Sequence, residues 1–169
     1  MTRSLILAVA LCLLPLASRA SSPPRVVGCI QSAASVYQLP PAVILILLSV
    51  EDGSLGRVSQ NTNRTVDIGP MQVNSIWVPA VARHWRASQS DTYAALKDSF
   101  CANVEAGSWI LRQAMDEAHG DFWEGVGFYH SHDPGYVAAY LRKVLRQTLQ
   151  LQAQALRETK LSHQAAAGG

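Results

Sequence analysis

The sequence predicts a mostly α-helical protein with a single domain and a short β-hairpin. Apolar residues recur at helical spacing through most of the chain, and the breaks between these segments fall at Pro, Gly, Asn and Asp. Only the stretch Thr65–Ile68 alternates as a β-strand does. The length of 169 residues fits one domain with a substantial core. We therefore expect helices packed around a single core.

The first twenty residues have the pattern of a signal peptide. Arg3 supplies a positive charge, residues 5–16 are apolar, and Ser18-Arg19-Ala20 resembles a cleavage site. The apolar run is too short for a permanent membrane anchor. We expect the protein to be exported and cleaved after Ala20.

Two helices are predicted next. Residues 21–28 contain two prolines and suggest an extended lead-in, and Cys29–Gln38 has apolar residues at helical spacing. Pro41 is well placed to begin a second helix, because a helix's first residue needs no amide hydrogen. That helix should run to about Asp52 and be buried, since it is apolar on every side, with Gly53 as its terminating residue.

The middle of the chain predicts a polar loop and two short helices. Residues 54–70 are rich in Gly and Asn and hold the candidate hairpin. Asn74 is expected to cap a helix that reaches Trp85, and Ser90 to cap another that ends near Lys97.

Three further helices are predicted in the last third of the chain. They are a long helix from Cys101 to His119, a shorter one that begins at Asp121, and a last one from about Tyr136. The folded domain would span 21–160, and residues 161–169 would form a disordered tail. The polar segment after residue 150 fits a solvated helix end better than a docking segment.

The charge excludes one class of function. The chain has fourteen Lys and Arg and twelve Asp and Glu, so its net charge is +2. Arg3 and Arg19 would leave with the signal peptide, which makes the mature chain nearly neutral. Nucleic-acid binding would need a basic tract that this sequence lacks.

The cysteines predict a disulfide bond. Cys12 lies in the apolar N-terminal segment, which leaves Cys29 and Cys101 in the exported chain. An even pair in an oxidising compartment favours a disulfide, although two buried free thiols are the alternative. A bond across about 70 residues would contribute on the order of 4 kcal/mol on the chain-entropy model.

Glu51 directly follows the apolar helix. Burial of a carboxylate is costly unless the group is protonated or paired, so a carboxyl at this rim should have a raised pKa. A neutral carboxylic acid suits protonation of the leaving oxygen of a glycosidic bond. The local pattern fits a solvent-exposed glutamate in a last helical turn equally well.

A longer pattern resembles the lytic transglycosylases, which share a fold with goose-type lysozyme. It consists of Glu51-Asp52-Gly53 and an Asn-rich loop that ends in Gly69-Pro70-Met71-Gln72-Val73-Asn74. Residues 101–107 and 128–131 follow in the order expected for that family, so the resemblance covers about residues 29–145. The small, cysteine-paired form is most similar to the transglycosylases of conjugation, type IV secretion and pilus systems.

The resemblance implies a lysozyme-like domain and a set of site residues. Glu51 would be the catalytic acid and base. The cleft would be lined by Gly69, Met71, Gln72, Asn74 and Tyr129, with Tyr140 nearby. We expect no cofactor and no metal. The protein would be a periplasmic monomer that binds peptidoglycan glycan strands and works beside components of a secretion, conjugation or pilus machine.

The implied reaction cleaves the β-1,4 bond between N-acetylmuramic acid and N-acetylglucosamine and leaves 1,6-anhydromuramoyl ends. One carboxyl suffices in this family, because the 6-hydroxyl of the substrate attacks C1. A muramidase that uses water on the same bond is one alternative. A weakly active peptidoglycan-binding assembly factor is another.

Several residues depart from the family's pattern or invite other interpretations. Asp52, Pro70 and His130 stand where Ser, Leu and Asn are usual, and Asp52 either tunes Glu51 or faces solvent. Asp67 is expected to be a structural residue that accepts backbone N–H bonds, rather than a second catalytic carboxylate. His130 and His132 are too few for a zinc site. Most of the four tryptophans should be core, with one in the cleft.

Overall fold

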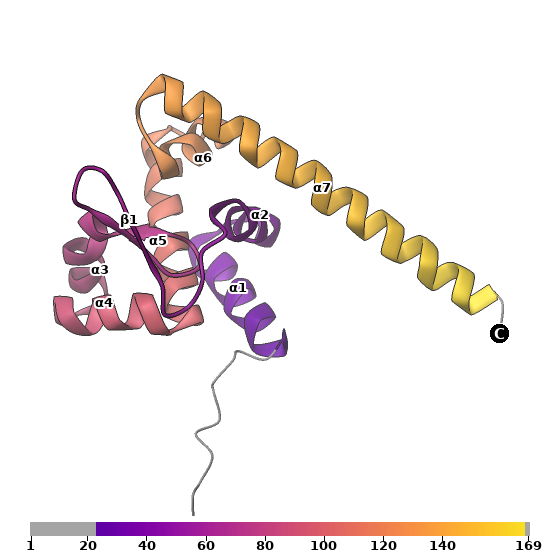
Figure 1. Cartoon of the computed structure of the whole chain (residues 1–169), viewed down its shortest axis with the longest axis horizontal. Helices are drawn as coiled ribbons and strands as arrows, with labels where there is room; N and C mark the ends of the chain where they lie inside the picture. The colour runs from indigo at the N-terminus through magenta and orange to yellow at the C-terminus, as the bar shows by residue number, and fades with distance from the viewer. Residues whose placement is uncertain (1–22, 168–169) are drawn as a thin grey trace, which may run out of the picture.

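The computed structural model describes residues 23–167, so the predicted signal peptide and its cleavage site lie outside the described residues. The described part is mostly helical, with a small antiparallel sheet and one disulfide bond (Figure 1). The helices are α1 (Pro23–Tyr37), α2 (Pro41–Glu51), α3 (Val78–Trp85), α4 (Gln89–Asp98), α5 (Phe100–Glu117), α6 (Phe122–His130) and α7 (Pro134–Ala167).

The first helix begins six residues earlier than the periodicity predicts. The two prolines at its start fall in the first turn, where the amide hydrogens that proline lacks would have no helical partner. Pro41 is the first residue of α2, as predicted.

The end of α2 differs from the prediction by one residue. Asp52, not Gly53, adopts the left-handed conformation, with φ 52°, and its backbone N–H bonds the carbonyl of Leu48. Gly53 is needed for space instead. A Cβ there would lie 2.1 Å from the carbonyl oxygen of Gly69, so the cleft loop packs directly on this backbone.

Three short strands follow α2. β1 (Val58–Gln60) pairs antiparallel with β2 (Val66–Ile68), which pairs antiparallel with β3 (Val73–Asn74). Asn74 ends the sheet and caps the 3-10 helix η1 (Ser75–Trp77), where its side chain accepts from the N–H of Ile76. The predicted hairpin is therefore a three-stranded sheet that continues into α3.

Two helix starts are set by polar caps. Asp121, the predicted first residue of this helix, instead caps α6 by accepting from the N–H of Glu124. The cap of α4 is Ser88, which accepts from the N–H of Asp91, and the predicted cap Ser90 lies in the first turn. Both serines stand near the start of the same polar segment, and only the fold decides between them.

The core lies between α5, α1, α2 and the inner side of the sheet. α5 contacts α1, α4, α6 and β3, so it is the central helix. The largest fully buried side chains include Ile44 and Leu47 from α2, Ile68 and Met71 from the sheet region, and Leu111 from α5. The prediction that α2 is buried holds for one side of the helix only: Val43, Ile44, Leu47 and Val50 are buried, whereas Pro41, Ala42 and Leu45 are exposed.

The disulfide Cys29–Cys101 is formed and joins α1 to α5. The two Cα atoms lie 5.1 Å apart, within the normal range for a disulfide. The bond therefore fastens the first helix to the central one.

The C-terminal segment corrects the expectation of a disordered tail at 161–169. α7 continues as one helix to Ala167. Residues 145–167 contain no Gly or Pro and are rich in Ala, Leu, Gln, Lys and Arg, which are strong helix formers. The helix leaves the body and projects well beyond it (Figure 1).

Among residues 23–167, no single helix is long and apolar enough to cross a membrane. Only α1 and α2 taken together meet that length and composition, as a pair bent by 120°.

Candidate active site

Glu51 lies in the last turn of α2, on the wall of a cleft. Its Oε1 accepts a hydrogen bond of 2.5 Å from the hydroxyl of Tyr140 in α7. Burial raises the pKa of Glu51 above its ordinary value, and nearby Asp67 adds to this. The Tyr140 bond and the charge of Lys143 oppose the rise but do not cancel it. The local environment therefore shifts the Glu51 carboxyl toward its protonated form relative to an ordinary glutamate.

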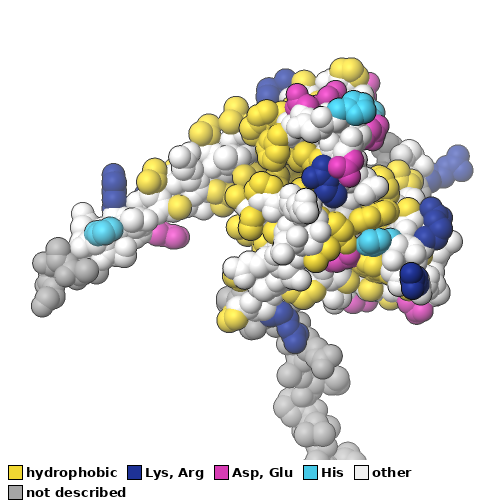
Figure 2. All heavy atoms as spheres, turned by 180° about the vertical axis from the view of Figure 1, so that it is seen from behind, with side chains coloured by type: hydrophobic (Ala, Val, Ile, Leu, Met, Phe, Trp, Pro, Cys, Tyr) yellow, Lys and Arg dark blue, Asp and Glu magenta, His cyan; other side chains and the backbone are white. Residues whose placement is uncertain are grey.

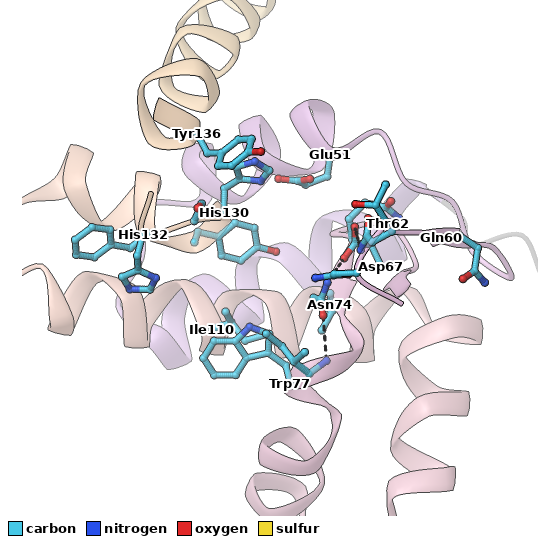
Figure 3. A pocket seen from close by; sticks show the side chains of 18 residues that line it. Glu51, Gln60, Thr62, Asp67, Asn74, Trp77, Ile110, His130, His132 and Tyr136 are labelled. Atoms are coloured by element: carbon cyan, nitrogen blue, oxygen red, sulfur yellow. Dashed lines mark hydrogen bonds between the residues drawn. The ribbon is translucent and has the colours of Figure 1, made fainter. Parts of the chain in front are cut away.

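The cleft has a volume of about 700 Å³ and two walls of different chemistry. One wall comes from the loop and sheet and carries amides and hydroxyls, from Gln60, Asn61, Thr62, Asn63, Gln72 and Asn74. The other comes from η1, α6, the turn after α6 and the start of α7, and carries rings, from Trp77, Phe128, Tyr129, His130, His132 and Tyr136. Figure 3 shows Glu51 beside His130 and Tyr136, with Thr62 and Asp67 across from them.

Asp67 is tied into the polar wall. Its two carboxylate oxygens accept from Asn61 Nδ2 at 2.9 Å and from Asn74 Nδ2 at 2.7 Å. The sequence predicts backbone N–H partners for Asp67, but its partners are side-chain amides, and Asp67 also lines the cleft. Thr65 accepts from the same two amides, at 3.1 and 3.0 Å, so this network fixes the polar wall.

Asn103 in α5 fastens the loop beneath the cleft. Its side chain is fully buried and makes three hydrogen bonds to backbone groups. It donates to the carbonyls of Ile68 (2.8 Å) and Leu96 (2.9 Å), and it accepts from the N–H of Met71 (2.7 Å). One amide thus joins the central helix, α4 and the loop.

Gly69 and Met71 support the cleft from below and are not part of its lining. Gly69 has φ +68°, and a Cβ there would lie 2.4 Å from Asn103 Nδ2 and 2.5 Å from the carbonyl oxygen of Leu96. The Met71 side chain is fully buried against Gly107, where a Cβ would meet its sulfur at 2.6 Å. Both the positive φ and the close packing against α5 and α4 therefore require glycine at position 69.

The remaining residues that the resemblance implies lie in or directly behind the cleft. Gln72, Asn74 and Tyr129 line the cleft with Glu51. Gln72 donates to the carbonyl of Gly69 and accepts from Ser59, and Tyr129 donates to the carbonyl of Met71 at 2.9 Å. Tyr140 is almost fully buried and stands behind Glu51.

His130 covers Tyr140. Its imidazole stacks nearly parallel on the phenol ring, with centroids 4.4 Å apart and an interplanar angle of 4°. Burial, followed by the charge of Lys143, lowers the pKa of His130, whereas Asp67 acts in the opposite direction. Neutral imidazole is therefore the favoured form beside Glu51.

Sequence reasoning missed some of these roles. Asn103 was noticed only as part of a family-like stretch, and nothing local marks it as the contact between α4, α5 and the loop. The sequence predicts Tyr136 only as a helix start, although its exposed side chain lines the cleft. Trp77 is the one tryptophan that lines the cleft, in line with the expected count. Asp52 is exposed at the end of α2.

No group of three or more His, Cys, Asp or Glu side chains among residues 23–167 is arranged to hold a metal ion. No protein-family model matches the chain, and a search of curated proteins finds no match either.

Proposed function

We propose that the protein is a peptidoglycan lytic transglycosylase with a lysozyme-like fold. Its substrate would be the β-1,4 bond between N-acetylmuramic acid and N-acetylglucosamine. The proposal rests on the resemblance of residues 51–74, 101–107 and 128–131 to that family, and on the site that these segments form.

The observation that carries the proposal is the state of Glu51. A general acid that acts near neutral pH needs a pKa above that of an ordinary carboxyl, together with access to the substrate. Burial raises the pKa of Glu51, and the carboxyl still lines the open cleft. In the first step, Glu51 would protonate the bridging oxygen. In the second, as carboxylate, it would take the proton from the 6-hydroxyl while that oxygen closes on C1.

The two walls of the cleft suit a glycan strand. Sugars present apolar ring faces and a rim of hydroxyl and acetamido groups. The aromatic wall would contact ring faces through Trp77 and Tyr136, and the polar wall would hydrogen-bond the rim through Gln72 and Asn61. A volume of about 700 Å³ leaves room for more than one sugar ring.

The setting follows from the resemblance. Exported to the periplasm, such an enzyme would open the cell wall locally for a secretion, conjugation or pilus apparatus. Glycan strands would be its substrate, and components of that machine its partners.

The test is digestion of purified sacculi by wild type and by Glu51→Gln, with Asp52→Asn as the control. Glu51→Gln keeps the size of the side chain but cannot donate or take the proton, so we expect a loss of at least 100-fold, the scale of general acid catalysis. Asp52→Asn removes a neighbouring exposed carboxylate and should retain activity.

Mass spectrometry of the released muropeptides identifies the reaction. Anhydromuramoyl ends support the transglycosylase, and reducing ends would replace it with a muramidase. A Glu51→Gln protein that digests sacculi as well as wild type would refute both. Intact binding without digestion by wild type would favour the assembly factor.

A further inference from the structure

Beyond Leu151, every residue of α7 whose side chain the structure describes (152–164) is exposed. Gln147 donates to Ser49 in α2 at 2.7 Å, and after that point the side-chain hydrogen bonds of α7 stay within the helix. Leu149 and Leu156 are 56% and 58% exposed, and Leu145 on the same helix is 53% exposed. A helical segment of this length is marginal by itself in water, so a second surface would stabilise it.

These three leucines form one stripe. They are spaced by four and seven residues, so at 100° per residue they lie within about 40° of one another around the helix. Spacings of this kind place side chains on a single face. Figure 2 shows hydrophobic side chains gathered where α7 leaves the body and continuing along it.

The leucine stripe has a basic border. Arg142, Arg146, Arg157 and Lys160 lie about 60–120° around the helix from Leu145, all on the same side. The only acid in α7, Glu158, lies on the opposite side of the helix. With Lys143, the helix has five basic residues and one acidic residue. The face is thus apolar at its centre and positive along one edge.

An apolar groove extends this face onto the body. It has a volume of about 460 Å³ and is lined by Ala42, Leu45, Ile46 and Ser49 of α2, with Thr148 and Leu151 among the residues of α7. Leu45 is also exposed. The unpartnered surface therefore includes both the helix and its junction with the domain.

The charges argue against a second copy as the occupant. In an antiparallel pair of α7 helices centred near residue 151, Arg142 would stand opposite Lys160 and Arg146 opposite Arg157. Like charges so placed are destabilising. A parallel pair would juxtapose each basic residue with its own copy.

An anionic lipid surface fits both features. Helices that lie in a membrane interface combine an apolar face with Lys and Arg along the polar side, and acidic headgroups attract those cations. We propose that α7 docks the protein on an anionic lipid membrane, with Leu145, Leu149 and Leu156 inserted between headgroups and the basic border against them. This docking does not depend on the proposed reaction.

Co-sedimentation with phosphatidylcholine vesicles, with and without phosphatidylglycerol, tests the docking of the full chain. We expect binding to the phosphatidylglycerol vesicles that weakens as salt is added. Leu149→Gln/Leu156→Gln should weaken binding at least tenfold. The matched variant Val27→Gln/Val36→Gln, which changes two exposed apolar residues of α1, should bind as wild type does. Residues 1–22 are the same in every variant, so any binding of vesicles by this segment affects all variants equally.

A second pair of variants tests the basic border. Arg146→Gln/Arg157→Gln/Lys160→Gln should weaken binding on the order of 100-fold, at about a factor of five for each basic residue near the surface. Arg25→Gln/Arg57→Gln/Arg83→Gln removes three exposed charges elsewhere and should lower binding less than threefold. Circular dichroism of each variant confirms that it is folded.

The experiment measures vesicle binding only, so its result does not depend on the proposed reaction. Equal binding by the α7 variants and their matched controls would overturn the proposal, and so would equal binding to both kinds of vesicle. Wild type that forms a dimer without vesicles, lost in Leu149→Gln/Leu156→Gln, would assign the face to a second copy instead. Glu51→Gln should bind vesicles as wild type does, so failure of the proposed reaction would leave the docking result intact.

Discussion

Two opposed effects act on the pKa of Glu51. Burial disfavours its charged form, whereas the hydroxyl of Tyr140 and the charge of Lys143 favour it, and the pKa remains raised. Tyr140 is itself held under the ring of His130. The pKa of Glu51 therefore depends on two side chains from α7, far from it in sequence.

Tyr140→Phe should extend activity to higher pH. The change removes a hydrogen bond that stabilises the carboxylate, so the pKa of Glu51 rises further and the protonated acid persists to a higher pH. A bond to a charged group contributes about 1.5–3 kcal/mol, which corresponds to roughly one to two pH units. The pH at which kcat/KM of sacculus digestion falls on its alkaline side measures this shift.

Tyr136→Phe is the matched control, because Tyr136 lines the cleft and is 65% exposed, but the tyrosine that bonds Glu51 is Tyr140. For Tyr136→Phe, the fall of kcat/KM at alkaline pH should coincide with that of wild type. A fall for Tyr140→Phe that stays in place, or moves to lower pH, would contradict the role assigned to the bond between Tyr140 and Glu51.

At the scale of elements, the cleft depends on the close approach of the loop to α2, α4 and α5. Gly53, Gly69 and Gly107 each leave no room for a Cβ, and Asn103 joins the elements at their meeting point. Glycine at position 69 therefore reflects both backbone conformation and crowding.

Two glycine variants separate these effects. Gly69 and Gly56 both have positive φ, at +68° and +76°, but only Gly69 is crowded. Gly56→Ala should cost about 1–2 kcal/mol from conformation alone. Gly69→Ala should cost more, above about 3 kcal/mol, because Asn103 must also move. Urea unfolding measures both, and equal losses would show that crowding adds nothing.

The element boundaries show what local sequence can predict. Apolar periodicity located the long helices, because each buries apolar side chains along at least part of its length. It could not predict that Asp52, rather than Gly53, would adopt the left-handed conformation at the end of α2. Nor could it predict that α1 would begin at its two prolines. The helical tail was missed because its composition, polar but strongly helix-forming, was interpreted as disorder.

The candidate site was predictable to a similar extent. Gln72, Asn74 and Tyr129 line the cleft with Glu51, as the motif implied. Gly69 and Met71 belong to the same motif but lie beneath the cleft. The motif therefore contains residues that pack under the cleft as well as residues that line it. Asn103 and His130 act through contacts across the fold, which spacing along the chain does not reveal.

For the whole molecule, the disulfide closes a long part of the chain. Cys29 and Cys101 are 72 residues apart, and the segment between them contains α2, the sheet and α4. The bond restricts the unfolded chain and so favours the folded one.

Removal of this bond should lower stability without changing the reaction. Cys29→Ser/Cys101→Ser should lose about 4 kcal/mol of unfolding free energy, from the entropy of the longer open chain. Chemical denaturation measures the loss, and digestion well below the unfolding transition should yield the same products. A midpoint equal to that of the oxidised wild type would show that the bond contributes no stability.

The unbroken course of α7 sets a distance. The helix holds Tyr140 against Glu51 and, sixteen residues later, presents Leu156, which at 1.5 Å per residue is about 24 Å away. The helix has no break between these two residues. A surface that binds the outer half of α7 would therefore set both the distance of the cleft from that surface and the orientation of the cleft toward its substrate.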